Sequence, residues 1–344
     1  MKKALLLLTV VLALLSCKSG KKVPDVSGIK TNIRFLRFDR DFFSIDSNNV
    51  LQGLNQLDRN YPELTPIFLQ NILGLDSAST LGGVRSFLSL NASIDSAVTV
   101  RFKDMDGVRR EFEKAFQFVS YYFPQYKLPA SVITVTGPVD ALAQSSGGYT
   151  PDFLGNNFLG ISLQFYLGAD YPVYHDPFFV EKVAPEYRSR RFSKEYIISD
   201  AMMLIVDDLF PDQSAGKPLV EQMIEKGKQW YLLDKFLPNA PDSVKTGYTR
   251  QQLDWCEQNE GLIWAEIVRN EDLNSISPTV IQTYIGEGPF TQGFSQENSP
   301  GNLGPWIGWQ IVKKFAGKHP DMKPEEVMKT PARKILEEAK YKPK

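Results

Sequence analysis

The stretch QENSPGNLGPWIGWQIVKKF (residues 296–315) holds two prolines, three glycines and two tryptophans. Proline and glycine are typical of turns, so the first half of the stretch predicts a loop. Pro305 is compatible with the first turn of a helix. After it, Ile307, Ile311 and Phe315 recur at the spacing of one helix face. We therefore expect a loop that leads into a helix with one apolar face.

Trp306 and Trp309 lie three residues apart on that helix and are therefore neighbours on one side of it. If both are buried, the stretch is a packed corner of the core, which is the interpretation we favour. If both are exposed, they are candidate partner-binding residues on a docking surface. The stretch has no histidine, cysteine or phosphate loop, so it is not predicted to be the wall of an active site.

Helical patterns continue on both sides of this stretch. The segments 195–210 (EYIISDAMMLIVDDLF) and 218–237 (PLVEQMIEKGKQWYLLDKFL) repeat apolar residues at helical spacing. Thr249 followed by Gln252 forms a capping-box pattern that predicts another helix start. The segment 331–341 (PARKILEEAKY) predicts a last helix. The second half of the chain is therefore expected to be mostly helical.

Strand patterns gather in the first half of the chain. The segments 33–38 (IRFLRF), 130–138 (ASVITVTGP) and 156–168 (NNFLGISLQFYLG) are rich in β-branched and aromatic residues. Between the last two, 143–152 (AQSSGGYTPD) is expected to be a loop, and 111–123 is expected to be a helix. This distribution predicts an α+β fold, a mostly helical single domain with a small β-sheet.

The N-terminus, MKKALLLLTVVLALLSCKSG (1–20), combines two lysines with an apolar run that ends before Ser16 and Cys17. The run is shorter than the ~20 residues needed to cross a bilayer, so it predicts a signal peptide over residues 1–16. Residues 14–17 (LLSC) resemble a bacterial lipobox, which implies cleavage before Cys17 and its acylation, for example with palmitate. More than one acyl chain makes a membrane anchor stable.

A polar stretch follows the cysteine, so residues 17–28 are expected to be a lipidated cysteine and tether, ahead of one domain over 29–344. Residues 18–22 (KSGKK) are basic, unlike the acidic run that resembles a surface-export signal. We therefore expect a lipid-anchored protein of the cell envelope that faces the periplasm, in either membrane. A plain secretory signal with an incidental cysteine is the alternative.

Composition and the scarce residue types limit the chemistry. A composition of 42% hydrophobic and 23% charged residues predicts a globular protein, and a net charge of −1 offers no basic surface for nucleic acid. The two histidines, His175 and His319, have no second histidine or cysteine at ligand spacing. Cys256 has apolar neighbours at helical spacing and is expected to be a buried structural thiol. We expect no metal and no cofactor.

Several long strings resemble one known family. They are 38–46 (FDRDFFSID), 158–174 (FLGISLQFYLGADYPVY), 225–238 (EKGKQWYLLDKFLP), 247–264 (GYTRQQLDWCEQNEGLIW) and 299–312 (SPGNLGPWIGWQIV). With the lipobox, they occur in the order and spacing of the gliding motility lipoprotein GldB family of Bacteroidetes. The resemblance covers nearly the whole mature chain. It implies a cell-envelope lipoprotein that gliding requires and that acts close to the type IX secretion apparatus, with envelope proteins of that machinery as partners.

A more distant resemblance concerns mechanism. The order of helix, strand, strand and helix is similar to that of gluzincin-type putative zinc proteases, which carry HExxH on the helix after the sheet. Here the corresponding slot, residues 199–203, reads SDAMM. Ser199, Asp200 and Met203 take the motif positions, and Glu225 lies near the place of a third ligand. Because neither histidine is present, the resemblance implies a degenerate zincin-like scaffold that has lost its metal.

Two functional hypotheses follow from these patterns. The first is a non-catalytic assembly or binding component of the gliding and secretion machinery. The second is a periplasmic hydrolase, peptidase-like or cell-wall-directed, that uses carboxylates alone. Its candidate residues lie on predicted helices: Asp200, Asp207, Asp208, Glu225, Glu257, Glu260 and Glu266. Because helical carboxylates usually form a solvated face, the second hypothesis requires two of them to meet in a pocket with perturbed pKa values.

Tyrosines suggest a further binding surface. Tyr166, Tyr171 and Tyr174 could line an aromatic groove for sugars or peptide. Gly168 and Pro172 mark a bend among them, so packing in the core and in a turn is the alternative.

Overall fold

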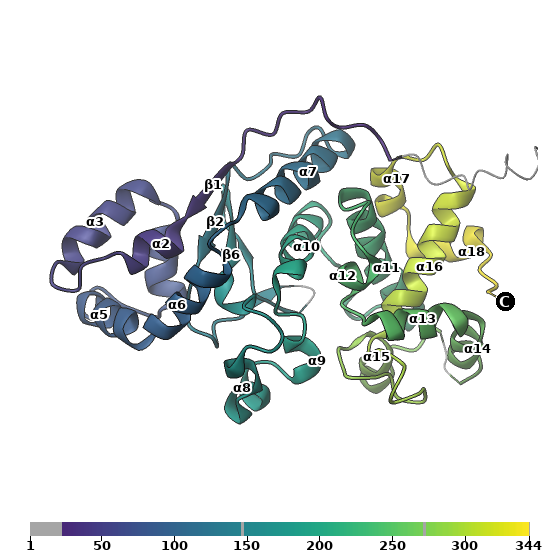
Figure 1. The fold of residues 1–344 in the computed structure, drawn as a ribbon. Helices are drawn as coiled ribbons and strands as arrows, with labels where there is room; N and C mark the ends of the chain where they lie inside the picture. Colours follow the sequence, from purple (N-terminus) through teal and green to yellow (C-terminus); the bar gives the residue numbers. More distant parts are fainter. Residues whose placement is uncertain (1–22, 146–147, 271–272, 344) are drawn as a thin grey trace, which may run out of the picture.

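The computed structural model describes residues 23–145, 148–270 and 273–343 (Figure 1). Its helices surround a small β-sheet. The strand order is β1 (Arg34–Arg37), β2 (Ser131–Val135), β6 (Phe158–Ser162) and β5 (Phe153–Leu154). The first three strands are parallel, and β5 runs antiparallel at one edge. Every residue of β2 and β6 is buried, as expected for strands that are covered on both faces.

The two faces of the sheet belong to two apolar cores. Neighbouring residues of a strand point to opposite faces, and Val132 and Ile133 accordingly lie in different cores. The smaller core packs Ile133 against N-terminal helices, on the left of Figure 1. These are α2 (Phe38–Phe43), α3 (Val50–Asn60), α4 (Leu64–Ile67), the π-helical turn η1 (Phe68–Ile72) and α5 (Thr80–Leu90).

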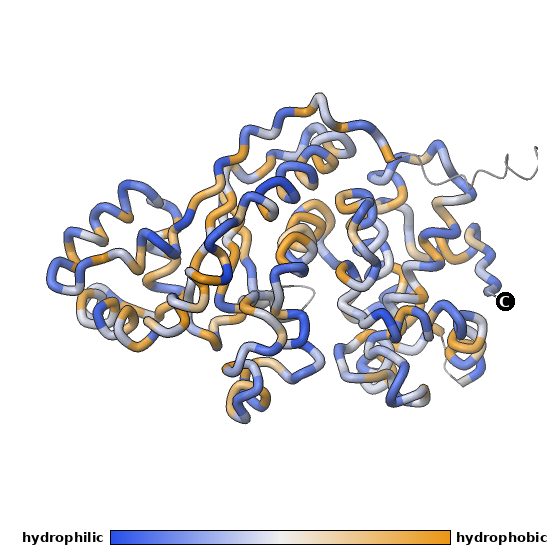
Figure 2. The backbone as a smooth tube through the Cα atoms, viewed as in Figure 1, coloured by the Kyte–Doolittle hydropathy of each residue, from blue (hydrophilic) through white to orange (hydrophobic). Residues whose placement is uncertain are grey.

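The larger core joins the other face of the sheet to the C-terminal helices. It contains Val132 together with residues of α6 (Ala92–Arg101), α7 (Asp106–Tyr122) and α10 (Ile197–Leu209). Figure 2 shows apolar colour along the strands and on α10, while most outer turns are hydrophilic. The shared core makes the chain a mostly helical, single α+β domain, so the predicted fold class is confirmed.

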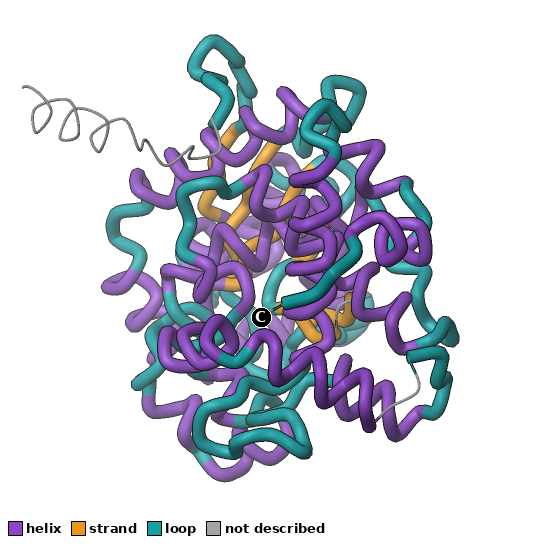
Figure 3. Tube along the Cα trace, turned by 90° about the vertical axis from the view of Figure 1, so that its right-hand side faces the viewer, coloured by secondary structure: helices purple, strands orange, loops and turns teal. Residues whose placement is uncertain are grey.

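Figure 3 shows that helices and loops make up most of the remaining chain. The short elements around α10 are η2 (Leu163–Phe165), η3 (Pro172–His175), α8 (Pro177–Lys182), α9 (Glu186–Ser189) and η4 (Lys194–Tyr196). The later helices are α11 (Leu219–Phe236), α12 (Asp242–Thr246), α13 (Arg250–Gln258), α14 (Glu260–Asn270), α15 (Pro278–Ile285), α16 (Leu303–Lys318), α17 (Pro324–Lys329) and α18 (Ala332–Ala339). In the described ranges, no helix has the length and apolar character needed to cross a bilayer.

Helices α11 and α16 form the central crossing of the C-terminal half, and glycine makes it possible. A Cβ atom on Gly308 would lie 1.7 Å from the Met223 carbonyl oxygen, and one on Gly227 would lie 2.2 Å from the Gly308 carbonyl carbon. The two backbones therefore touch at this point. Trp306 and Trp309 flank the crossing and are 2% and 1% exposed. They pack in the core, so neither side chain is available to a docking partner.

Most sequence predictions of individual elements agree with the structure, and two need correction. The capping box of Thr249 and Gln252 is present. The predicted loop 143–152 contains a short antiparallel ribbon, β3 (Ala143–Ser145) with β4 (Gly148–Thr150). The predicted strand 156–168 ends at Ser162, because the chain turns there into η2. Both differences arise from pairing and turn geometry, which hydrophobic patterns record poorly.

The described part of the predicted tether packs on the domain. Val26 is fully buried, and the amide of Gln117 in α7 donates a hydrogen bond to the Ile29 carbonyl at 2.9 Å. In Figure 1 this segment crosses above α7 on its way to β1. The predicted signal peptide and Cys17 lie outside the described residues.

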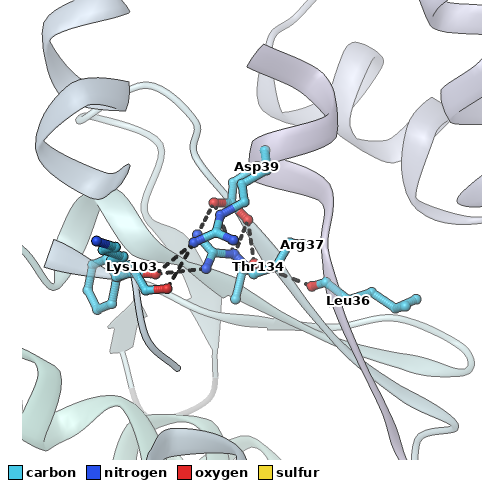
Figure 4. Close-up of polar contacts among 7 residues, drawn as sticks. Leu36, Arg37, Asp39, Lys103 and Thr134 are labelled. Atoms are coloured by element: carbon cyan, nitrogen blue, oxygen red, sulfur yellow. Dashed lines mark hydrogen bonds and ion pairs between the residues drawn. The ribbon is translucent and has the colours of Figure 1, made fainter. Parts of the chain in front are cut away.

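A buried ion pair joins β1 to α2 at the carboxyl end of the parallel strands (Figure 4). The Arg37 guanidinium donates to Asp39 at 2.6 Å and to the Phe102 carbonyl at 2.8 Å. Thr134 of β2 also donates to Asp39, which is only 2% exposed. Because all of these charged groups have partners, the cluster fixes the start of α2 against the sheet.

Candidate functional site

A cavity of about 190 Å³, the central cavity, lies between α10 and the C-terminal helices. Its walls come from residues 142 and 150–151, α9 and the segment after it, α10, α11, α12, the end of α15 with the loop after it, and the start of α16. Both apolar and charged side chains line these walls. The charged ones are Arg188, Arg191, Asp200, Asp207, Lys226, Lys245 and Glu287. We consider this cavity the candidate site because seven charged side chains from several elements of the described chain line it.

Two carboxyl groups meet on one tyrosine hydroxyl beside the cavity. The Tyr166 hydroxyl lies 2.8 Å from Asp152 Oδ2 and 3.2 Å from Asp200 Oδ2. Asp152 is fully buried and also accepts a hydrogen bond from the Ser162 backbone N–H at 3.0 Å. One hydroxyl proton can serve only one of the two carboxylates. Both contacts are therefore hydrogen bonds only when one carboxyl holds a proton.

The pKa values of these carboxyls reflect that competition. Burial raises the pKa of Asp200 to about 6, while the Arg191 guanidinium and the bond from Tyr166 oppose the rise. Burial, and then the charge of Asp200, raise the pKa of Asp152 well above its usual range. Burial also raises the pKa of Tyr166, so its hydroxyl stays protonated near neutral pH. The two carboxyls of Asp152 and Asp200 therefore tend to keep a proton at a pH where most carboxyls are ionised.

An ion-pair cluster forms another part of the cavity wall. Arg188 of α9 and Arg191, which follows that helix, both pair with Glu287, which follows α15. The two guanidinium groups hold the pKa of Glu287 below its usual range, although burial acts in the opposite direction. The cluster joins segments almost a hundred residues apart and closes one side of the cavity.

The remaining cations on the wall are also paired. Lys226 Nζ lies 2.7 Å from Asp212 Oδ2, and Lys245 bonds to Asp234 and Asp242. Asp234 in turn accepts a hydrogen bond from the Trp309 ring nitrogen, which ties the cavity wall to the crossing of α11 and α16.

The structure brings three of the four motif-like residues to this cavity. Ser199, Asp200 and Met203 line it from successive turns of α10. Glu225 does not line it and instead pairs with the buried Lys228 at 3.0 Å. A serine hydroxyl and a methionine thioether are not the nitrogen, thiolate or carboxylate ligands that zinc uses, so this donor set does not fit the metal.

The histidines and the other carboxylates lie apart from one another. His175 bonds to the Ala169 carbonyl, and His319 pairs with Glu338. Among the described residues, no group of three or more His, Cys, Asp and Glu side chains could hold a metal ion. Of the candidate carboxylates, only Asp200 and Asp207 line the cavity. The partners of the others include Tyr126 for Asp208, Tyr341 for Glu260 and Arg269 for Glu266, and Glu257 is exposed.

The tyrosines do not form an open groove. Tyr166 and Tyr174 are fully buried, and the Tyr174 hydroxyl donates to the Gln164 carbonyl at 2.6 Å. Tyr171 is partly exposed and packs against the Tyr174 ring. These side chains stabilise the bend, and Tyr166 serves the carboxyl pair. Cys256 is fully buried, as predicted for a structural thiol.

The site residues that sequence reasoning missed include Asp152, Arg188, Arg191 and Glu287. They lie in loops or at the ends of short elements, where apolar periodicity carries no information. The signal that existed was the run of three arginines within four positions, 188–191. Such a run usually marks a solvated surface, so it did not distinguish a cavity wall.

A family model described as "Gliding motility protein GldB" matches residues 19–343. No curated protein and no solved structure has significant similarity to the chain.

Proposed function

Because this chain belongs to the family of the gliding motility protein GldB, we propose that it is a non-catalytic binding component of the gliding machinery. The family match over residues 19–343 is the observation that carries this proposal. The donor set of the central cavity supports it, since Ser199 and Met203 stand where zinc chemistry would need histidines. The binding site would be the central cavity, because the tryptophans of α16 are buried.

The same proposal includes a membrane anchor. Residues 1–16 would be removed as a signal peptide, and Cys17 would carry the acyl chains that hold the protein in the envelope, facing the periplasm. Its partners would be envelope proteins of the gliding and type IX secretion apparatus. The short distance along the chain from Cys17 to the buried Val26 supports a domain held close to the membrane surface.

Genetic complementation tests the motility role. Deletion of the gene in a gliding host should abolish colony spreading, and the full-length gene should restore it. Cys17→Ser should fail to restore spreading and should lose labelling by radioactive palmitate, whereas the neighbouring Ser19→Ala should behave as wild type. A deletion strain that spreads and secretes normally would refute the proposal.

A second candidate is favoured by one observation. Asp152 and Asp200 meet on Tyr166 beside a cavity, and the pKa of Asp200 is raised to about 6. A carboxyl tuned toward neutral pH can act as a general acid or base toward a bound water. This arrangement would suit a carboxylate-dependent hydrolase of the periplasm, directed at peptides or the cell wall.

In vitro turnover separates the two candidates. The purified protein would be incubated with peptidoglycan fragments and with a peptide mixture, and the products identified by mass spectrometry. Hydrolysis that disappears in Asp200→Asn and persists in Glu257→Gln would favour the hydrolase. No turnover by the wild type between pH 5 and pH 8 would leave the binding role.

A further inference from the structure

Arg191 lines the central cavity with hydrogen-bond donors to spare. Its side chain is 26% exposed and, within the described residues, makes one hydrogen bond, from NH2 to Glu287 Oε1 at 3.2 Å. A guanidinium has five N–H donors in a planar fork that matches a carboxylate. Gly247 provides the room beside it, because a Cβ atom there would lie 2.6 Å from Arg191 NH1.

Asp200 lines the same cavity with one oxygen uncommitted. Its Oδ2 contacts the Tyr166 hydroxyl, and no described residue bonds to its Oδ1. The Arg191 guanidinium lies near enough to affect its ionisation. When protonated, Asp200 can donate a hydrogen bond to a ligand oxygen; when ionised, it repels an anion.

We propose that the central cavity binds the carboxylate of a small or chain-terminal ligand, held by the Arg191 guanidinium and by the protonated Asp200 carboxyl. Phe192, Met203, Trp230 and Ile285 also line the cavity and supply apolar contact for a group next to that carboxylate. This inference rests on the proposed binding role and names the chemistry of the ligand. The C-terminal residue of a peptide has this combination of groups.

The charges around Asp200 favour a carboxylate over an ammonium ligand. The titratable and charged groups that surround Asp200 or line the same cavity are Asp152, Tyr166, Arg188, Arg191, Tyr196, Asp207, Lys226, Lys245 and Glu287. Glu287 is shared by Arg188 and Arg191, so protonation of Asp200 leaves the arginine pair with more positive than negative charge. An ammonium ligand beside Asp200 would instead lie next to that positively charged arginine pair.

Binding of this kind takes up a proton. With the pKa of Asp200 near 6, about three quarters of the carboxyl is protonated at pH 5.5 and only a few per cent at pH 7.5. If the protonated form alone accepts the ligand, affinity should rise about twentyfold from pH 7.5 to pH 5.5. The ligand carboxylate itself stays ionised across that range.

Isothermal titration of the full-length protein with three probes tests the inference. All three probes carry the apolar leucine side chain and differ in charge. N-acetyl-leucine has a carboxylate, N-acetyl-leucinamide is neutral, and leucinamide has an ammonium group and no carboxylate. We expect N-acetyl-leucine to bind, about twentyfold more tightly at pH 5.5, and both amides to bind at least tenfold more weakly at that pH. Arg191→Lys, which keeps the charge but loses the fork, should weaken binding severalfold. Asp200→Asn should retain binding and lose most of its pH dependence.

Arg250→Ala is the matched control, because this arginine is exposed on the surface of α13 and does not line the cavity. It should bind the probe as the wild type does. Tighter binding of leucinamide than of N-acetyl-leucine, or affinity unchanged between the two pH values, would overturn the inference. So would the absence of heat with every probe at millimolar concentration. If any of these outcomes is observed while the deletion strain still loses spreading, the proposed ligand is wrong and the proposed motility role is unaffected.

Discussion

Replacing Gly308 by alanine should destabilise the protein, although alanine is the better helix former. In an ordinary helix interior the exchange gains about 1 kcal/mol. At the crossing of α11 and α16, however, the new Cβ would lie 1.7 Å from the Met223 carbonyl oxygen. The obstacle is backbone, so no side-chain rotation can relieve the overlap, and the two helices must separate.

The magnitude follows from the balance of these terms. Overpacking of a core costs about 1–3 kcal/mol, and a backbone obstacle places this site at or above the upper end. After the helix-propensity gain is subtracted, we expect a net loss of about 2 kcal/mol or more. For a chain of this size a loss of about 2 kcal/mol corresponds to a melting temperature about 3 °C lower. Urea unfolding followed by tryptophan fluorescence would measure it, because Trp306 and Trp309 flank the crossing.

Gly317→Ala is the control within the same helix. A Cβ atom at Gly317 would meet nothing within 4 Å, so this exchange should be neutral or stabilise by up to about 1 kcal/mol. If Gly308→Ala proved as stable as Gly317→Ala, the close backbone contact between α11 and α16 would be refuted.

Three further predictions concern buried charges and the thiol. Arg37→Met should lower the free energy of unfolding by about 3–5 kcal/mol, because it leaves the buried Asp39 carboxylate without its cation. The control Arg109→Met removes an exposed pair and should change urea stability by less than about 0.5 kcal/mol; equal effects of the two variants would contradict the structural role of the Arg37–Asp39 pair. The raised pKa of Asp200 means that the wild type loses free energy of unfolding as the pH rises from about 4 through about 6, where the folded carboxyl is forced to ionise. Asp200→Asn has no such loss, so its stability should increase relative to the wild type by up to about 2–3 kcal/mol over this range. A difference in urea stability that does not vary with pH would be evidence against this assignment. Cys256, which is fully buried and whose pKa burial raises, should resist maleimide in the folded protein and react after unfolding, as mapped by mass spectrometry.

Helix and strand patterns predicted much of the fold because they depend on local spacing. The apolar face of 195–210 became α10, and the β-branched run at 130–138 became β2. The ribbon within 143–152 escaped prediction because its strands are held by pairing with each other, through Gly-rich sequence that has little strand propensity of its own. The α11–α16 crossing escaped as well, since a glycine in a helix signals a close approach only when its partner is known.

Asp200 was named from the sequence as a motif-like position and as a candidate carboxylate, and it does line the cavity. Its environment could not be anticipated, because Asp152 and Arg191 lie on separate segments that come together only in the folded chain. The same holds for Tyr166, whose hydroxyl acquires its role from two carboxyls distant in sequence.

The sequence by itself determined the helix-rich α+β class, the helix-start signal at Thr249 and the absence of a histidine pair for zinc, because each of these is a property of residue type or of local spacing. The tertiary structure alone decided that Trp306 and Trp309 are buried, that Asp152 and Asp200 meet on the Tyr166 hydroxyl, and that Arg191 lines the same cavity as Asp200. Burial and long-range proximity arise only when helices pack. A raised carboxyl pKa depends on both and therefore has no counterpart in the linear sequence.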